Sequence, residues 1–508
     1  MSEPTEKTAS RGQRVGYVLG PAALVLMLLL PAPEGLRPEA WRVAAVTVHM
    51  AIWWISEAIP IPATSLLPIA LFPLLGVMPS AEAAAPYANH MIYLFMGGFF
   101  LAVTMERWDL HRRIALHTIR LVGTSPERMV LGFMVATAFL SMWVSNTATT
   151  MMMVPIGMAV IRQGTAAKEG EEATPAARAF GRSLMLGIAY SASIGGVGTI
   201  IGTPPNTVMV GMVEKMYGAE IGFARWMALA VPLSTVMLAL TWYLLTRVLH
   251  PCRGLVLAGG AQIISRELRA LGPMRREEKQ ILAVGCCAAA LWLSRGFLRD
   301  VTLINELWPA FRTHVHDATI AIVGSVALFA IPTSLRRGTF LLDWDTALKI
   351  PWGVVILFGG GLAIAAGFAH TGLAQFIAEQ LGVLEGTGLT LFVAIVVLAT
   401  VFLTEITSNT ATATLLVPIM GTAAVAMGYH PFATIVGACV AASFAFMLPV
   451  ATPPNAVVFG SGSVTIRQMA RTGLWINLAG AVLITLTVVG LLPLLWGVDL
   501  HAVPAWAR

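Results

Sequence analysis

The chain has few charged residues: Asp, Glu, Lys and Arg make up 11% of its 508 residues, against roughly a quarter in ordinary globular proteins. It has only four cysteines, and their spacing fits no metal site. It contains neither an HExxH motif nor a pair of aspartates inside an apolar segment. These absences argue against a soluble multidomain protein and against a membrane-embedded enzyme that works through paired acids or a metal.

The composition is dominated instead by apolar residues. Hydrophobic residues account for 57% of the chain, the mean hydropathy is +0.78, and long apolar runs recur over the whole length. Because backbone groups in lipid must be hydrogen-bonded internally, this composition predicts an all-α polytopic membrane protein. The sequence pI near 9.3 reflects basic loops beside apolar spans. We interpret these loops as orientation signals rather than as a nucleic-acid surface.

One polar stretch occurs twice in the sequence. Ser-Asn-Thr at 145–147 returns as Ser-Asn-Thr at 408–410 with a constant shift of 263 residues. A Thr-Pro-Pro-Asn cluster follows each copy, at 203–206 and at 452–455. An internal repeat of this kind fixes the architecture before any single element is considered.

Each Ser-Asn-Thr copy lies in the middle of a long apolar region, 129–160 or 389–426. Each arm of the first region has about 15 residues, or about 23 Å of helix, which is too short to cross a hydrocarbon core of about 30 Å. We therefore expect two re-entrant hairpins with the polar triplets at their tips. The eleven transmembrane spans that we expect are 15–30 (an uncleaved first helix), 41–58, 61–77, 89–106, 183–216, 226–249, 280–297, 318–331, 352–370, 431–460 and 474–496.

The positions of the basic residues indicate how the chain is oriented. When these spans are threaded through a bilayer, most of the 32 Lys and Arg residues fall on one side, which by the positive-inside rule is the cytoplasm. The first hairpin is flanked by basic segments, whereas 351–466 contains no Lys or Arg. We expect inverted repeats with hairpins entering from opposite sides, and a plasma (inner) membrane location with a cytoplasmic N-terminus.

The repeated clusters carry chemistry without charged side chains. The spans 183–216 and 431–460 are interrupted by the Thr-Pro-Pro-Asn clusters, and proline disrupts a helix. The N-terminus of a half-helix directs N–H groups at an anion, while unwound carbonyls hold a cation. Hydroxyl, amide and carbonyl oxygens are hard ligands, which suit sodium and not transition metals. Ser141 and Ser145 are spaced i, i+4, and so are Thr404 and Ser408.

These motifs resemble those of the divalent anion/sodium symporter family, which includes sodium–dicarboxylate and sodium–citrate cotransporters. The segments Trp-Trp-Ile-Ser-Glu-Ala-Ile-Pro-Ile-Pro at 53–62 and Tyr-Leu-Phe-Met-Gly-Gly at 93–98 also look like that family, and the resemblance covers roughly 15–497. It implies symport of a small di- or tricarboxylate with two or more sodium ions and no organic cofactor. It also implies a homodimer in which a transport domain moves like an elevator against a scaffold domain.

Site residues follow from the resemblance residue by residue. One sodium site would use Ser141, Ser145, Asn146 and the Gly202 carbonyl. The other would use Thr404, Ser408, Asn409 and the Ala451 carbonyl. The substrate carboxylates would meet Asn146, Thr147, Thr203, Asn409, Thr410 and Thr452.

The resemblance also divides the chain into parts. Scaffold helices and an interfacial helix at 107–120 would form 15–128, and transport elements would form 129–225 and 389–473. The remaining parts would be the tail 1–14, the scaffold helices with a basic loop and the second-repeat entry at 226–388, and the last helix with its tail at 474–508. Within the basic loop we expect 265–279 to be a solvated connector.

Several alternatives stay open at this point. Ser, Thr, Asn and Gly also mediate helix packing in membranes, although duplication of the whole set argues against packing alone. Glu405 lies near the second tip, but its counterpart in the first repeat is Met142, so we expect structural pairing for it. Within the transporter class, a sodium-independent dicarboxylate exchanger and a sodium/sulfate symporter are alternatives. A channel would need a continuous pore, and an intramembrane protease would need a base near Ser145 or Ser408, which the sequence does not supply.

Overall fold

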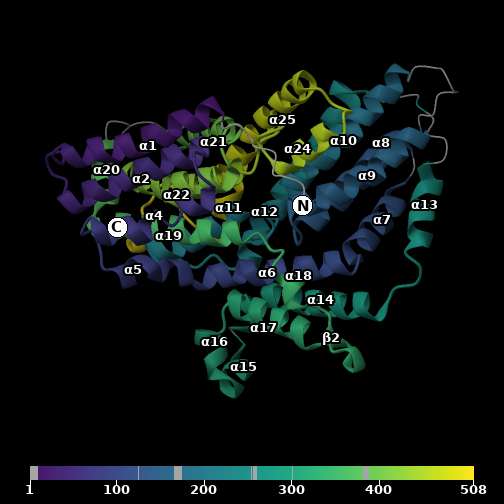
Figure 1. Ribbon diagram of the computed structural model, residues 1–508, viewed down its shortest axis with the longest axis horizontal. Helices are drawn as coiled ribbons and strands as arrows, with labels where there is room; N and C mark the ends of the chain where they lie inside the picture. The colour runs from purple at the N-terminus through teal and green to yellow at the C-terminus, as the bar shows by residue number, and fades with distance from the viewer. Residues whose placement is uncertain are drawn as a thin grey trace, which may run out of the picture.

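The computed structural model describes residues 10–123, 125–164, 174–252, 255, 260–299, 301–381 and 388–507. This part of the chain is almost entirely helical (Figure 1). A two-stranded antiparallel sheet pairs β1 (Pro332–Ser334) with β2 (Thr339–Phe340). The all-α architecture expected from composition is confirmed.

Seven helical segments of the described chain are long and apolar enough to span a membrane. Four shorter apolar helices accompany them, at Ile61–Leu74, Asp317–Ala330, Leu389–Thr404 and Phe432–Ala441. The chain is therefore a multi-pass membrane protein. The long candidate spans are Arg11–Leu29, Ser80–Arg107, Phe223–Leu249, Arg276–Leu298, Trp352–Thr371, Asn409–Ala426 and Ile466–Trp496.

The two hairpins begin and end at equivalent positions of the repeat. Helix α8 (Pro126–Ser141) turns into α9 (Asn146–Gly164), and α21 (Leu389–Thr404) turns into α22 (Asn409–Ala426). The first arms have 16 residues each, close to expectation, whereas the second arms have 19 and 18 residues. The turns fall at the polar triplets because Ser and Asn favour helix N-caps over helix interiors.

Each hairpin is followed by a broken helix. Helix α10 (Pro175–Gly196) resumes as α11 (Pro204–Tyr217), and α23 (Phe432–Ala441) resumes as α24 (Pro453–Gly460). The prolines of both Thr-Pro-Pro-Asn clusters occupy the first two positions of the resumed helix. A missing N–H has no cost at these positions, so the prolines start the second half of the helix as well as interrupting the first.

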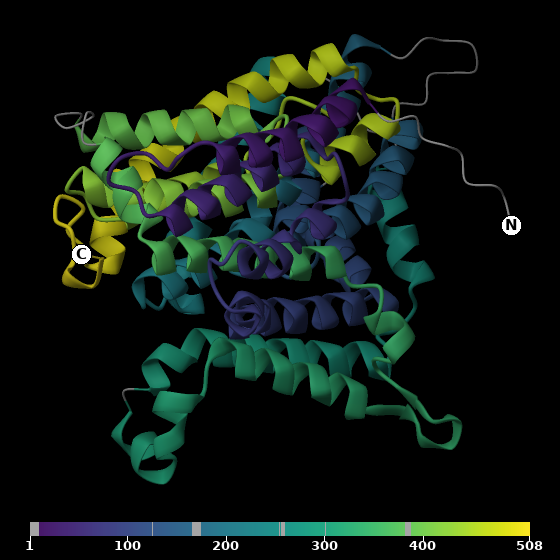
Figure 2. The ribbon, with the colours of Figure 1, turned by 60° about the vertical axis from the view of Figure 1, so that its left-hand side comes forward.

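The two halves of the chain pack crosswise. The second arm of each hairpin lies against the resumed helix of the other repeat, so that α9 packs on α24 and α22 packs on α11. The Ser463 hydroxyl just after α24 donates to Met158 Sδ of α9 at 3.3 Å. A Cβ added at Gly361 would lie 2.3 Å from Thr414 of α22 and 2.9 Å from Met212 of α11. Figure 2 shows the helices of both halves within one bundle.

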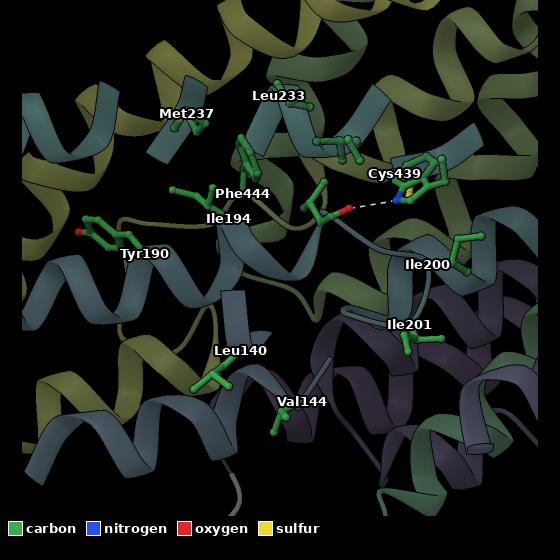
Figure 3. Packing of buried hydrophobic residues seen from close by; sticks show 14 of the residues in the cluster. Leu140, Val144, Tyr190, Ile194, Ile200, Ile201, Leu233, Met237, Cys439 and Phe444 are labelled. Atoms are coloured by element: carbon green, nitrogen blue, oxygen red, sulfur yellow. Dashed lines mark hydrogen bonds between the residues drawn. The ribbon is translucent and has the colours of Figure 1, made fainter. Parts of the chain in front are cut away.

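A single apolar core joins the repeats. Figure 3 shows Leu140 of α8 and Tyr190 of α10 in the same cluster as Cys439 and Phe444 from the second half. The Cys439 thiol donates to Asn206 Oδ1 at 3.5 Å. The broken helices of both repeats are thus held against one another in the interior of the protein.

Two regions differ from the sequence-based expectation. The expected span at 61–77 consists of two short helices, α3 (Ile61–Thr64) and α4 (Leu67–Leu74), since Pro68 has no N–H to donate to the Thr64 carbonyl in a continuous helix. The expected connector at 265–279 overlaps α13 (Gly260–Ala270), an amphipathic helix that lies across the ends of the long helices (Figure 1). It packs against α7 (Leu110–Val122) and α9.

The remaining helices surround these elements. The layer of α14 and α17 runs beside α6 at one side of the bundle in Figures 1 and 2. The other elements are α1 (Arg11–Leu29), α2 (Pro38–Ser56), α5 (Ser80–Ala84), η1 (Ala85–Ala88), α6 (His90–Arg107), α12 (Phe223–Tyr243), η2 (Leu244–Leu249), α14 (Arg276–Leu298), α15 (Thr302–Leu307), α16 (Pro309–His314), α17 (Asp317–Ala330), η3 (Leu335–Arg337), α18 (Trp344–Ala347), α19 (Trp352–Thr371), α20 (Leu373–Leu381), α25 (Ile466–Leu486), η5 (Thr487–Leu491), α26 (Leu492–Trp496) and η6 (Ala505–Ala507).

Candidate functional site

The tip of the first hairpin touches the first helix break. A Cβ added at Gly196 would lie 2.8 Å from Asn146 Oδ1 and 3.1 Å from the Gly202 carbonyl oxygen. A Cβ added at Gly202 would lie 3.0 Å from the Ser141 carbonyl oxygen. Three of the four residues expected in the first cation set, Ser141, Asn146 and Gly202, therefore converge on one place.

The polar atoms of this place are buried without partners. The Ser141 hydroxyl and Asn146 Oδ1 are both buried and have no hydrogen-bond partner within the described residues. An unsatisfied buried oxygen costs about 1–3 kcal/mol, and the role of this pair as cation ligands remains a prediction. Ser145, the fourth expected residue, is half-buried beside them, and its hydroxyl lies 3.5 Å from the Ala148 amide at the start of α9.

Asn206, which is not among the expected site residues, holds the first break open. The side-chain amide of Asn206 donates to the carbonyls of Val197 at 3.0 Å and Thr199 at 2.7 Å, and lies 3.4 Å from that of Gly196. These carbonyls are not used by helix α10 because the helix has ended. Asn206 thereby fixes the unwound backbone that brings Gly202 to the tip.

The tip of the second hairpin is built from the same oxygen types. Thr404 Oγ1 lies 2.8 Å from Asn409 Oδ1 and 2.8 Å from the Ala442 carbonyl oxygen. A hydroxyl has one proton, so it can donate to only one of these two acceptors at a time. Ser408 is the N-cap residue of α22 and its side chain makes no capping hydrogen bond. Three oxygens share one proton at this tip, and a cation site here remains a prediction.

The second break is longer than the first and is held differently. It runs from Ala442 to Thr452, whereas the first runs from Val197 to Thr203. The side-chain amide of Asn455 donates to the carbonyls of Ala445 and Leu448, each at 3.0 Å. Asn455 thus does in the second break what Asn206 does in the first. The carbonyl that lies beside Thr404 is that of Ala442, and the use of the Ala451 carbonyl remains a proposal.

Glu405 organises this longer break. Its carboxylate accepts the backbone N–H groups of Phe446 at 2.7 Å, Met447 at 2.9 Å and Leu448 at 3.0 Å. The side chain is buried, and three backbone amides compensate the charge in place of a cationic residue. The expected structural pairing of Glu405 is therefore with backbone amides.

Each tip lies at the break of its own repeat, and the two repeats are joined by packing between helices. The joining contacts are the crossed packing of α9 with α24 and of α22 with α11. Both pairs of crossed helices begin at a tip or a break, so α9, α11, α22 and α24 each start at one of the four motifs. Those N-termini carry partial positive charge and unpaired N–H groups that suit an anion.

The residues expected to bind substrate occupy these helix starts. Thr203 and Thr452 are the N-cap residues of α11 and α24, and both are buried. Thr452 Oγ1 accepts a hydrogen bond from the backbone N–H of Asn455 at 3.3 Å, whereas Thr203 makes no side-chain capping bond. Thr147 and Thr410 follow the tip asparagines in the first turns of α9 and α22. Their contact with a substrate remains a prediction.

Sequence profiles identify the family. Residues 12–498 match the profile of the sodium:sulfate symporter transmembrane region. The chain therefore belongs to this family of membrane transporters, and the resemblance to the divalent anion/sodium symporters is confirmed.

Two relatives from staphylococci are similar over nearly the full length. A protein of Staphylococcus saprophyticus named sodium-dependent dicarboxylate transporter SdcS is 46% identical over 494 residues, covering 97% of this chain and 94% of that protein. A Staphylococcus aureus protein of the same name is 45% identical over 497 residues, with 98% and 94% coverage.

Solved structures share the fold at low sequence identity. The YdaH transporter of Alcanivorax borkumensis has a TM-score of 0.57 at 14% identity, covering 89% of this chain and 98% of that one. MtrF of Neisseria gonorrhoeae has a TM-score of 0.53 at 13% identity, with 93% and 94% coverage. These two structures support a helical transporter fold.

Proposed function

We propose that this protein is a secondary active transporter that couples inward sodium movement to uptake of a small di- or tricarboxylate, and that it is not an enzyme. The observation that carries the proposal is the pair of buried oxygen sets at the two tips, Ser141 with Asn146 and Thr404 with Asn409. The names of the staphylococcal relatives support sodium and dicarboxylate as the pair of solutes.

The two oxygen sets and the four helix starts have complementary roles. Sodium ions in the two sets would place positive charge next to the N-termini of α9, α11, α22 and α24. The carboxylates of a doubly charged substrate would then find N–H groups, the hydroxyls of Thr147 and Thr410 and two counter-ions in one place. Without sodium, the neutral oxygens would repel the substrate carboxylates, so binding of the two solutes is coupled.

The topology that we propose follows the inverted repeat. Eleven spans and two opposed re-entrant hairpins would place the N-terminus in the cytoplasm of a cell bounded by this inner membrane. Segments 129–225 and 389–473 would form a transport domain that moves against scaffold segments 15–128 and 226–388, with 474–508 as the last helix and tail. Two chains would form a homodimer through the scaffold. The clustering of both hairpins with both broken helices supports one moving unit.

Uptake of radiolabelled succinate by proteoliposomes tests this function. We expect accumulation driven by an inward sodium gradient and abolished when sodium is replaced by choline. Equal uptake with and without the gradient would contradict sodium coupling. If uptake then required dicarboxylate preloaded inside the vesicles, the exchanger alternative would hold.

Sulfate is the alternative substrate, favoured by the name of the family profile. Competition by unlabelled sulfate tests it in the same vesicles, and we expect citrate, malate or fumarate to compete and sulfate not to.

Thr404→Val removes an oxygen of the second set and should lower uptake. Thr235→Val is the matched control, because Thr235 lies exposed on α12 and bonds only its own helix at the Val231 carbonyl.

A further inference from the structure

Two amphipathic helices line an open basic cavity on the surface, outside the proposed transport site. Helices α7 and α13 pack against each other, and the cavity between them has a volume of about 800 Å³. It is lined by one face of each helix: Arg113, His117 and Arg120 from α7, and Gln262, Ser265 and Arg269 from α13. The spacings i, i+4, i+7 and i, i+3, i+7 place each set on a single helix face.

Two of the three arginines that line this cavity, Arg120 and Arg269, have no carboxylate partner among the described residues. None of the described residues that line it is acidic. Two carboxylates of the surrounding helices are engaged in ion pairs: Glu267 with Arg112 at 2.5 Å, and Glu278 with Arg113 of the cavity lining at 2.5 Å. Arg120 is exposed with no partner within the described chain, and Arg269 donates only to the Ser265 carbonyl of its own helix at 3.3 Å.

The apolar faces of both helices are already covered by the protein. Leu116 and Ile119 of α7, and Ile263 and Ile264 of α13, are buried. The helices are therefore held by the hairpin arms, because α7 packs on α8 and α13 packs on α9. Their basic faces point outward at this end of the bundle.

The surroundings of the cavity combine charge with an apolar surface. Leu268 lines the cavity, and Leu121, next to Arg120, is 86% exposed. In Figures 1 and 2, α13 crosses the long helices at one end of the bundle. On the proposed topology that end is the cytoplasmic surface of the membrane, where phospholipid headgroups and acyl chains meet. A small soluble anion has no apolar part that could pack against the exposed Leu121.

We propose that the α7–α13 cavity binds the phosphate headgroup of an anionic phospholipid. Arg120 and Arg269 are the main contacts of the phosphate oxygens, with His117 and Ser265 as further donors. The acyl chains lie along Leu121 and Leu268. A lipid bound there ties α7 and α13 together and thereby steadies both arms of the first hairpin.

Native mass spectrometry of the full chain tests this site without substrate or sodium, so its result does not depend on transport. Delipidated protein is titrated with phosphatidylglycerol, cardiolipin or phosphatidylcholine. We expect retention of the two anionic lipids in preference to phosphatidylcholine. Arg120→Ala combined with Arg269→Ala should weaken anionic lipid binding roughly twenty-five-fold, since each basic residue near a membrane surface contributes about a five-fold factor. Arg120→Lys with Arg269→Lys should recover most of it.

The control is Arg336→Ala with Arg337→Ala, an exposed pair in η3 that changes the net charge equally. The control should bind lipid as the unmodified protein does. The proposal is overturned if the cavity variant binds anionic lipid normally, or if the control loses as much. It is also overturned if inorganic phosphate stabilises the protein against heat as well as the lipids do, because the ligand would then be a soluble anion. The cavity variant should melt normally without lipid, since both side chains are exposed.

Discussion

Asn477 on α25 donates a 2.7 Å hydrogen bond to the carboxylate of Glu405, which lies in the tip of the second hairpin. The same carboxylate oxygen also accepts the amides of Phe446 and Met447. One buried anion thus connects the tip, the helix break and a neighbouring helix. The position of the Ala442 carbonyl beside Thr404 depends on this arrangement.

Glu405→Gln should therefore loosen the second break. A neutral amide offers one acceptor oxygen in place of two charged ones, and each hydrogen bond to a charged group contributes about 1.5–3 kcal/mol. We expect a lower melting temperature and a weaker sodium-induced rise in it. Asn477→Asp should be worse, because it places a second carboxylate beside the first. An unchanged melting profile for Glu405→Gln would contradict the anchoring role.

Ser141→Ala should have effects of opposite sign with and without sodium. Removing a buried hydroxyl that has no partner relieves its desolvation cost, so the sodium-free protein should gain about 1 kcal/mol. The same change removes a proposed cation ligand, and sodium should then stabilise the protein less at any concentration. Thermal unfolding across a sodium series measures both effects. If sodium protects the variant as well as the unmodified protein, Ser141 is not a ligand.

Gly202→Ala should abolish uptake and lower stability. Its Cβ would lie 2.4 Å from the Gly196 carbonyl oxygen, a backbone atom that can move only if the break moves, and such overpacking costs about 1–3 kcal/mol. Gly296→Ala is the control, because a Cβ there meets nothing within 4 Å, and alanine is the better helix former by about 1 kcal/mol. Normal transport by Gly202→Ala would remove the Gly202 carbonyl from the site.

Stability should fall as the pH is lowered from 7 to 5, through His250 just beyond η2. Burial, with a smaller contribution from Arg182, lowers the pKa of His250 to about 4. Between the unfolded value of about 6.5 and the folded value, the unfolded chain binds a proton that the folded protein does not. This favours unfolding, by about 2 kcal/mol at pH 5, with a plateau below pH 4.

The variant His250→Gln checks this assignment. It should make the fall of the melting temperature between pH 6.5 and 4 shallower but not abolish it, because burial also lowers the pKa of His430 to about 4. The His250 ring lies 2.9 Å from the Thr472 hydroxyl, so glutamine preserves a polar contact with α25. An equally steep fall in the variant would assign the pH dependence to other groups.

The hairpins and breaks could be located from sequence because a polar cluster inside an apolar segment is compatible with only a few backbone arrangements. An Asn at 146 or 409 inside a membrane helix would leave its amide unpaired, so it marks a helix start, and both second arms begin at these residues. The repeat then reduced the problem to one hairpin and one broken helix.

The role of Glu405 and the position of Ala442 could not be obtained in this way. Ala442 lies in the second break, which is longer than the first, and Glu405 accepts hydrogen bonds from that break. The first repeat offers no counterpart, since the residue equivalent to Glu405 is Met142, which carries no carboxylate. Asn206 and Asn455 could have been found, since both stand at the end of a duplicated cluster. Helix α13 was missed because its apolar face is short and its other faces are charged.

Because α9 rests on α24 and α22 rests on α11, each hairpin needs surfaces from the other half of the chain in addition to the broken helix of its own half. A half-length ancestor would have had to find those surfaces on a second copy of itself. The two copies in the present chain are not identical, since Glu405 of the second half corresponds to Met142 of the first.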